Sequence, residues 1–284
     1  MVEEMASGML FLCATPIGNL KDMTPRVIET LQEADVIAAE DTRNSIKLLN
    51  HFDIHTPMTS YHEYNKVDKA RELIRQMQEG KNVALITDAG TPAISDPGEV
   101  LVRMCQEQGI RVTSLPGPAA CITALTLSGL STRRFCFEGF LPADKKEKKE
   151  ILEELKGESR TIILYEAPHH LKNTLEELYL TLGERRITLC RELTKKFETV
   201  MPTTLEAALQ YYEEEEPRGE YVLVLEGKSL EEKRREKEDE WQEMSIEEHM
   251  AYYEERGIEH KEAMKAVAKD RGVSKREIYQ YLLK

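Results

Sequence analysis

The sequence lacks the short motifs that most often mark a binding or catalytic site. It contains no GxGxxG, no GxxxxGK[ST], no HExxH and no GxSxG. These absences remove the usual dinucleotide and P-loop signatures, a zincin-type metal site and an α/β-hydrolase nucleophile. A functional site in this chain must therefore be built from loops with other chemistry.

Cysteine pairs and long apolar runs are also missing. The five cysteines are scattered without a CxxC, and the seven histidines show no ligand spacing, so we expect neither a disulfide framework nor a metal. No apolar run approaches the ~20 residues of a membrane helix. The chain begins with acidic residues and not with a signal-peptide pattern. We expect a cytoplasmic protein without membrane contact.

Excess positive charge is absent, which argues against broad, nonspecific binding of nucleic acid. The net charge is −13. Residues 1–228 hold 27 Lys and Arg against 37 Asp and Glu, and residues 229–284 hold 12 against 15. Within that tail, residues 261–284 hold 7 against 3. A basic end therefore follows an acidic body.

The first half of the chain alternates apolar and amphipathic stretches, as α/β proteins with a mainly parallel sheet do. Strands are predicted within 9–20, 35–42, 57–61, 82–90 and 110–120, with helices between them and within 119–129. Thr24 is a good helix N-cap and Pro25 suits the first helical position.

The second half repeats the alternation, with two strands close together. Strands are predicted within 133–142, 160–170, 185–193, 197–203 and 219–227, with helices within 145–156, 171–183 and 204–212. The short gap after 193 indicates antiparallel pairing, and hence a mixed sheet. We expect domains at 1–129 and 130–228, then 229–284 as a charged linker or solvated helix followed by three short helices.

The last two predicted helices have the spacing of a helix-turn-helix. Gly272 forms the turn and Ser274 caps the second helix. The alternative is a small helical cap that packs on the body or at a dimer interface, and the sequence does not separate the two.

Three strand ends carry unusual loops, "ATPIGN", "TDAGTPAISDPG" and "PGPAA". Ligands of parallel sheets bind beyond the carboxyl ends of strands. "PGPAA" before a helix offers N–H groups to an anion, and the loop from Asp88 to Asp96 offers carboxylates to a cation. A site with little acid–base machinery suits a cofactor that brings its own reactive group, and S-adenosylmethionine fits this description.

The chain resembles the tetrapyrrole methylase superfamily of S-adenosylmethionine-dependent methyltransferases. Within it, the resemblance is to enzymes that methylate the ribose 2′-oxygen of a cytidine in the decoding region of 16S rRNA. The motifs lie in order over about residues 9–227: "ATPIGNLKDMTPR", "AAEDTR", "SYHEYN", "TDAGTPAISDPG", "PGPAA", "FEGFLP", "YEAPHHL", "CRELTKKFE" and "GEYVLVLEG". The resemblance implies two α/β domains with the cofactor between them and a small helical tail. It also implies a homodimer and the small ribosomal subunit as partner.

The resemblance also implies which residues bind the cofactor. Its methionine end would meet the first-domain loops, at Pro16, Gly90, Thr91, Pro92, Ile94, Ser95, Gly117, Pro118, Ala119 and Ala120. Its adenosine end would meet the second domain, at Leu164, Tyr165, Glu166, Ala167 and Tyr221. The alternative for the apolar members is plain packing, and for the glycines it is turn geometry.

The acceptor side is implied by "EDTR" and "SYHEYN". Substrate-binding candidates are Glu40, Arg43, Lys47, Glu63 and Asn65. A ribose hydroxyl needs a general base, and the candidates are Asp41, His62 and Asp88. The family usually has His at Tyr64, so a mechanism that needs that imidazole is in doubt here. The alternative for Glu40, Asp41 and Arg43 is a local ion pair at a helix start.

Two other functions remain open from the sequence. One is methylation of a tetrapyrrole or corrin precursor by the same fold. The other is a non-catalytic regulator that binds nucleic acid through its C-terminal helices, although their positive excess is modest.

Overall fold

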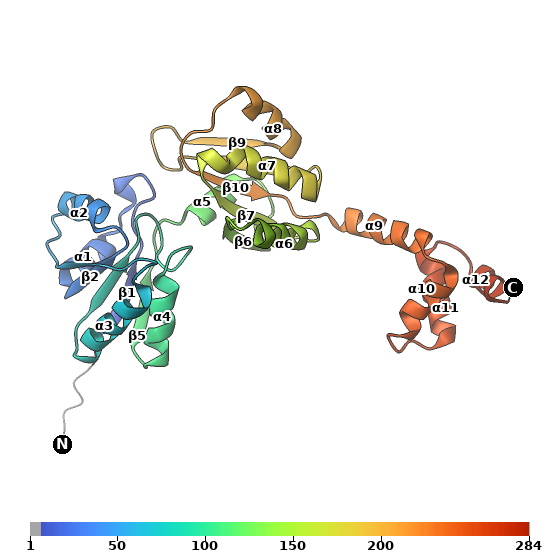
Figure 1. Ribbon diagram of the computed structural model, residues 1–284, viewed down its shortest axis with the longest axis horizontal. Coiled ribbons are helices and arrows are strands. Elements are labelled where there is room, and N and C mark those ends of the chain that lie inside the picture. The colour runs from blue at the N-terminus through green and yellow to red at the C-terminus, as the bar shows by residue number, and fades with distance from the viewer. Residues whose placement is uncertain (1–6, 284) are drawn as a thin grey trace, which may run out of the picture. The chain divides into compact units, whose positions relative to one another are not determined.

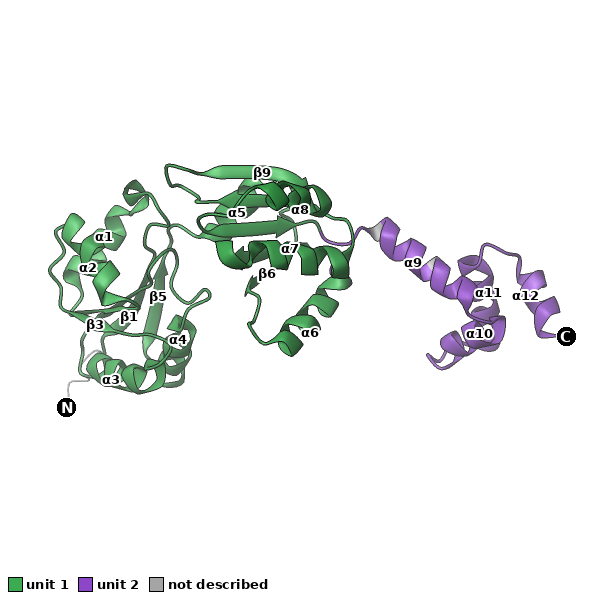
Figure 2. Ribbon diagram, turned by 45° about the horizontal axis from the view of Figure 1, so that its top comes forward, with its two compact units in different colours: residues 1–156, 160–226 green, residues 157–159, 227–284 purple. Residues whose placement is uncertain are grey.

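The computed structural model describes residues 7–283 (Figure 1). The acidic start of the chain, residues 1–6, lies outside the described residues. The chain divides into two compact units, residues 1–156 with 160–226, and residues 157–159 with 227–284 (Figure 2). We describe each unit by itself.

The first sheet contains five parallel strands in the order β3-β2-β4-β1-β5. Its strands are β1 (Met9–Cys13), β2 (Val36–Ala39), β3 (Met58–Ser60), β4 (Val83–Ile86) and β5 (Arg111–Leu115). All five therefore end at the same edge, which brings the loops after them together.

Four helices cover the two faces of this sheet, and together with it they form the first lobe. They are α1 (Pro25–Glu33), α2 (Thr42–His51), α3 (Lys66–Gln78) and α4 (Gly98–Glu107), and the 3-10 turn η1 (Leu20–Asp22) precedes α1. Side chains of α1 and α2 pack on one face, and those of α3 and α4 on the other. As predicted, Thr24 caps α1 by accepting from the Val27 N–H, with Pro25 at the first helical position.

The second sheet has the order β6-β7-β10-β8-β9 and is mixed, as predicted. Its strands are β6 (Phe135–Phe140), β7 (Thr161–Glu166), β8 (Arg186–Arg191), β9 (Thr199–Thr204) and β10 (Tyr221–Leu225). Strands β8 and β9 pair antiparallel, which confirms the prediction from their short separation. Among the neighbouring strands of this sheet, only β6 and β7 pair parallel.

Four helices complete the second lobe: α5 (Ala120–Leu127), α6 (Lys145–Lys156), α7 (Pro168–Leu182) and α8 (Leu205–Glu214). Helices α6, α7 and α8 pack on one face of the second sheet, and α5 packs on the other. Helix α7 begins earlier than predicted, because Pro168 takes its first position, so His169 and His170 lie in its first turn.

The second unit contains the helices α9 (Leu230–Glu243), α10 (Ile246–Glu254), α11 (His260–Asp270) and α12 (Lys275–Leu282). The charge-dense stretch after 228 is thus a helix, started by a capping box of Ser229 and Glu232. Helices α10, α11 and α12 share a small apolar core that includes Met250, Val267 and Ile278. Ser274 caps α12, as predicted.

A buried histidine joins the helices of this unit. The His249 side chain is fully buried, and its ring stacks on Trp241 and Tyr253 with centroid separations of 5.2 and 5.6 Å. Its Nδ1 accepts a hydrogen bond of 3.1 Å from Arg271 Nε, and Asp270 lies 3.4 Å from its Nε2. Burial, followed by the charge of Arg271, lowers the pKa of His249, although Asp270 opposes the shift.

We expect the helical unit to lose stability when the pH falls below about 6.5, the usual pKa of histidine. The unfolded chain then binds a proton that the folded unit resists, so the stability present above that pH is lost. The protection factors of amide hydrogen exchange over residues 246–270 of the full chain, which are corrected for the intrinsic pH dependence of exchange, should fall by up to about tenfold for each step of one in pH, until the folded His249 also binds a proton. His249→Gln keeps an acceptor for Arg271 and should flatten this pH dependence; an unchanged pH profile in the variant would contradict the explanation.

The predicted fold class is confirmed, because two lobes, each a sheet covered by helices, are followed by C-terminal helices. The domain boundary placed near 129 stays a prediction: α5 ends at Leu127, and both lobes belong to one compact unit. No helix among residues 7–283 is long and apolar enough to cross a membrane.

Candidate active site

The loops after β1, β4 and β5 are tied to one another at the carboxyl edge of the first sheet. Thr15 and Gly90 exchange two backbone hydrogen bonds of 2.9 and 3.0 Å. Thr91 Oγ1 donates to the carbonyl of Pro118 at 2.9 Å. The three loops singled out in the sequence therefore form one structure.

The loop between β4 and α4 is strained and is held by one carboxylate. Ala93 and Ser95 have φ angles of 69° and 60°, in the region that non-glycine residues rarely adopt. Asp96 accepts hydrogen bonds from the N–H groups of Ala93, Ile94 and Gly98 at 3.0, 3.2 and 2.7 Å. Burial raises the pKa of Asp96, although these donors act in the opposite direction. Strain of this kind concentrates at functional sites.

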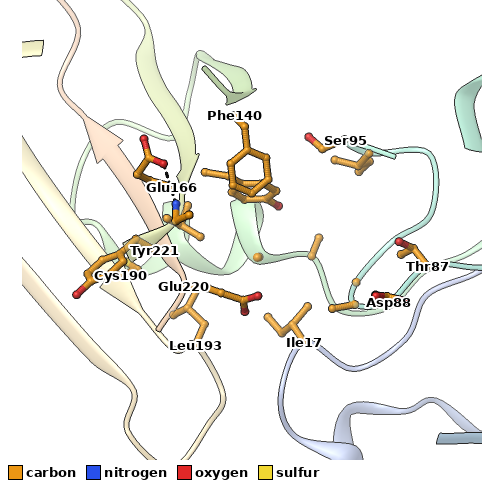
Figure 3. Close-up of a pocket in the computed structure, with 18 of the residues that line it drawn as sticks. Ile17, Thr87, Asp88, Ser95, Phe140, Glu166, Cys190, Leu193, Glu220 and Tyr221 are labelled. Carbon is orange, nitrogen blue, oxygen red and sulfur yellow. Dashed lines mark hydrogen bonds between the residues drawn. The ribbon is translucent and has the colours of Figure 1, made fainter. Parts of the chain in front are cut away.

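A cavity of about 570 Å³ opens between this edge and the second lobe. Its volume lies in the usual range for cofactor sites. Loops after β1, β2 and β4 line one side, and the ends of β7 and β8 with the start of β10 line the other. Figure 3 shows Asp88 and Ile17 on the first-lobe side, facing Glu220 and Leu193 across the cavity.

Most of the predicted cofactor residues lie on the wall of this cavity. They are Gly90, Thr91, Ile94, Ser95, Ala119, Ala120, Tyr165, Glu166, Ala167 and Tyr221. Pro16, Pro92, Gly117, Pro118 and Leu164 are not among the lining residues. A Cβ on Gly117 would lie 2.7 Å from the Ala14 Cβ, so its glycine is explained by packing.

Three residues predicted on the adenosine side, Leu164, Glu166 and Tyr221, use their side chains for contacts within the protein. Leu164 is fully buried in the core of the second lobe. The Glu166 carboxylate accepts from its neighbouring N–H of Ala167 and from Thr174 Oγ1, and it points away from the cavity (Figure 3). The Tyr221 hydroxyl pairs with Tyr212. Glu166 and Tyr221 can therefore offer mainly backbone to a ligand.

The N-terminus of α5 is partly satisfied by the second lobe. Tyr165 Oη accepts a hydrogen bond of 3.1 Å from the Cys121 N–H, and burial raises the pKa of Tyr165. The N–H of Ala120, one residue earlier, donates to no acceptor among residues 7–283, and Ala120 lies on the cavity wall. The helix start thus retains part of the predicted capacity for an anionic group.

Asp88 connects the cavity to the predicted acceptor side. This residue lines the cavity, and its carboxylate accepts from the Asp41 N–H at 3.2 Å and from Asn44 Nδ2 at 3.4 Å. Glu40 also lines the cavity and accepts from Thr87 Oγ1 at 2.8 Å. Of the three candidate bases, Asp88 alone is on the cavity wall.

Asp41 has a structural task instead. It caps α2 by accepting from the Arg43 N–H at 2.8 Å, and it holds the Arg43 side chain in two hydrogen bonds of 3.1 and 2.9 Å. The hydrogen bond from the Arg43 side chain, followed by that from its N–H, lowers the pKa of Asp41 to about 2. A carboxylate with so low a pKa is a weak proton acceptor, and the local ion pair considered from the sequence is present.

The remaining acceptor candidates lie outside the cavity wall. Asn65 accepts from the His62 N–H at 2.8 Å and donates to Ser60, so it shapes the loop after β3. Glu63 pairs with Lys66. His62 Nδ1 is buried without a hydrogen-bond partner in the described chain. Lys47, on α2, is exposed.

The lining residues without an assigned role in the sequence analysis include Phe140, Glu192, Lys195 and Glu220. These four belong to the motifs "FEGFLP", "CRELTKKFE" and "GEYVLVLEG", so the motifs were visible while the side-chain roles were not. Glu192 and Glu220 come together only because β8 and β10 are neighbours in the sheet.

The wall of the cavity fits S-adenosylmethionine in size and charge. It combines small and apolar residues with the carboxylates of Glu40, Asp88, Glu192 and Glu220. Lys195 is the only lysine or arginine among the described residues that line it. An acidic wall stabilises a ligand that carries a sulfonium charge.

Comparison with known sequences supports the same family assignment. Residues 9–209 match the family described as Tetrapyrrole (Corrin/Porphyrin) Methylases. The chain is 50% identical to the ribosomal RNA small subunit methyltransferase I of Halalkalibacterium halodurans, over 96% of this chain and 93% of that protein. It is 47% identical to the protein of the same name from Bacillus subtilis, with the same two coverages.

Solved structures of the same fold include a diphthine synthase, with a TM-score of 0.63 and 15% identity over 79% of this chain and 91% of that one. Another is the methyltransferase CobJ, with a TM-score of 0.58 and 21% identity over 78% and 95%. At such identities these structures support the fold alone. From the family match and the close relatives, we conclude that the chain belongs to the tetrapyrrole methylase family and, within it, to the group of the ribosomal RNA small subunit methyltransferases I.

Proposed function

We propose that this chain is an S-adenosylmethionine-dependent methyltransferase that methylates the ribose 2′-hydroxyl of a cytidine in the decoding region of 16S rRNA. The observation that carries the proposal is the position of Asp88. Asp88 lines the cofactor-sized cavity, and its carboxylate contacts the start of α2, where the acceptor residues were predicted. The names of the close relatives favour ribosomal RNA over a tetrapyrrole precursor.

The cofactor would be held mainly by backbone and small side chains. Gly90, Thr91 and Ala120 would contact its methionine end, while Tyr165 and Ala167 would lie against its adenosine. When bound, S-adenosylmethionine supplies a methyl group on a sulfonium, which is a good leaving group. The chain's own contribution is to align this donor, to keep water out and to take up the acceptor proton.

Asp88 is the proposed general base. A ribose hydroxyl becomes a good nucleophile as it loses its proton, and a carboxylate within hydrogen-bond reach can accept that proton. The methyl group passes to the ribose oxygen, and the proton passes to Asp88 and then to solvent. The hydrogen bonds from the Asp41 N–H and Asn44 fix the carboxylate for this task.

The RNA would approach along the first lobe, where the exposed side chains of Arg43 and Lys47 can meet phosphate. An acidic chain suits an assembled subunit as substrate, because specific contacts can then replace a general attraction to RNA. We also propose a cytoplasmic homodimer, in line with the family resemblance. Light scattering of the purified protein tests the dimer.

Incubation with tritiated S-adenosylmethionine and small ribosomal subunits that lack this modification tests the function. We expect label in 16S rRNA, and mass spectrometry of the digested RNA should find one ribose-methylated cytidine. Label on a base, or labelling of a corrin precursor in place of RNA, would refute the proposed acceptor. A protein that binds S-adenosylhomocysteine and RNA but never transfers methyl would favour the non-catalytic alternative.

A further inference from the structure

A compact charged network stands at the second-lobe side of the cavity and has no role in the proposed proton transfer. Lys195 Nζ donates to Glu192 Oε1 and to Glu220 Oε2, both at 2.9 Å. Glu192 Oε1 also accepts from the Glu220 N–H at 3.0 Å. All three residues line the cavity.

The backbone around this network is held in strained conformations. Glu192 and Thr194 have φ angles of 51° and 65°. Gly219 has a φ of 76°, and a Cβ there would lie 2.5 Å from Glu192 Cγ. The close approach of Gly219 lets the Glu192 carboxylate reach beneath Glu220. Such strained backbone conformations persist only where the surrounding structure holds them, and they occur most often at functional sites.

The side chains of Glu192, Lys195 and Glu220 differ in their exposure to solvent and in their contacts. Although burial opposes the shift, the Glu220 N–H and Lys195 lower the pKa of Glu192, so this carboxylate stays ionised. Its side chain is 21% exposed, and that of Lys195 is 31% exposed. The Glu220 side chain is 81% exposed and points across the cavity toward Ile17 (Figure 3). Glu192 and Lys195 therefore form the support, and Glu220 faces the ligand space.

One oxygen of Glu220 is left for a ligand. Oε2 is bound by Lys195, while Oε1 has no hydrogen-bond partner within residues 7–283. The Lys195 ammonium balances part of the negative charge, so Oε1 is suited to neutral hydroxyl donors. Carboxylates at the edges of nucleotide-binding sheets bind ribose hydroxyls in this way. Glu220 lies next to Tyr221 and beside the end of β7, on the wall proposed for adenosine.

We propose that Glu220 binds the ribose hydroxyls of the cofactor, with Lys195 and Glu192 as positioning residues. The inference rests on the proposed function, because it assumes an adenosine-containing cofactor in this cavity. It adds a specificity-determining contact: a ligand without the ribose diol should bind poorly, whatever its methionine end.

A thermodynamic cycle tests the contact by calorimetry. The full chain and Glu220→Ala are each titrated with S-adenosylhomocysteine and with its 2′,3′-dideoxy analogue. A hydrogen bond to a charged group contributes a substantial part of the binding free energy. The unchanged chain should therefore bind the dideoxy analogue about tenfold to a hundredfold more weakly than S-adenosylhomocysteine. In Glu220→Ala the two ligands should bind within about threefold of each other, because the variant has already lost the partner of the diol.

Two further variants serve as controls. Glu216→Ala removes an exposed carboxylate that pairs with Lys172 at 3.2 Å outside the cavity wall, and it should keep the full preference for the diol. Lys195→Met should reduce the preference by freeing Glu220, and Lys195→Arg should restore it. If Lys195 has only a structural role, Lys195→Met should instead weaken the binding of both ligands equally.

The outcomes separate this inference from the proposed function. If the unchanged chain binds S-adenosylhomocysteine but the penalty for the missing diol is the same in Glu220→Ala, the ribose contact is refuted and the function stands. An equal loss of affinity for both ligands in Glu220→Ala would likewise refute it and indicate a general charge effect. If the unchanged chain binds neither ligand, both the inference and the proposed function fail.

Discussion

Asp88→Asn should lower the rate of methyl transfer to the small ribosomal subunit by about two to four orders of magnitude, the usual range for a general base. Asparagine keeps the size of the side chain and can still accept from the Asp41 N–H, which Asp88 binds at 3.2 Å. It cannot take up the proton of the ribose hydroxyl. Single-turnover rates with saturating cofactor measure the effect, and the affinity for S-adenosylhomocysteine should change by less than about threefold.

Asp41→Asn is the matched control for this experiment. Asparagine is also a good helix N-cap, so the start of α2 should remain intact. Because Asp41 is held by Arg43 and has a pKa of about 2, its loss should cost less than about tenfold in rate. An Asp41→Asn variant as slow as Asp88→Asn, or an Asp88→Asn variant of normal rate, would show that the proton leaves by another route.

Asp96→Ala should weaken cofactor binding strongly and destabilise the first lobe. The Asp96 carboxylate accepts from three N–H groups and holds the loop with its left-handed residues Ala93 and Ser95. Without it, three N–H donors lose their partner, and the left-handed conformations of Ala93 and Ser95 lose the hydrogen bonds that fix this part of the loop. We expect a loss of about 2–4 kcal/mol in the free energy of unfolding, and at least a hundredfold weaker binding of S-adenosylhomocysteine by calorimetry.

Glu99→Ala tests whether this effect belongs to the loop. Glu99 lies in the first turn of α4, only three residues away, and is exposed. Its removal should change the free energy of unfolding by no more than about 0.5 kcal/mol. Full cofactor affinity in Asp96→Ala would mean that the loop contributes no contact to the cofactor, and the roles proposed for Gly90 and Thr91 would have to be withdrawn.

The strands and helices were predictable because their signals are local. Thr24 and Pro25 mark the start of α1 whatever the rest of the chain does. The four consecutive apolar residues of β4 indicate a strand buried on both faces. The start of α7 was missed by three residues because the polar pair His169 and His170 looked like a turn, while the helix start is set by Pro168.

The cofactor loops were also visible in the sequence, since glycine and proline at a strand end are local features. What each side chain does there was not visible. Asp41 and Asp88 looked like equal candidates for the base until the structure placed one in an ion pair and the other on the cavity wall. Glu166 stood in a cofactor motif, yet its carboxylate turns to Thr174 in the core.

The sequence by itself therefore determined the order of the elements, the parallel first sheet and the loops that meet at its edge, because periodicity and turn chemistry act over a few residues. Only the tertiary structure decided which carboxylates face the cavity. The contacts of Lys195 with Glu220 and of Tyr165 with Cys121 span 25 and 44 positions in the chain. Such contacts depend on which strands become neighbours, and no local pattern encodes that choice.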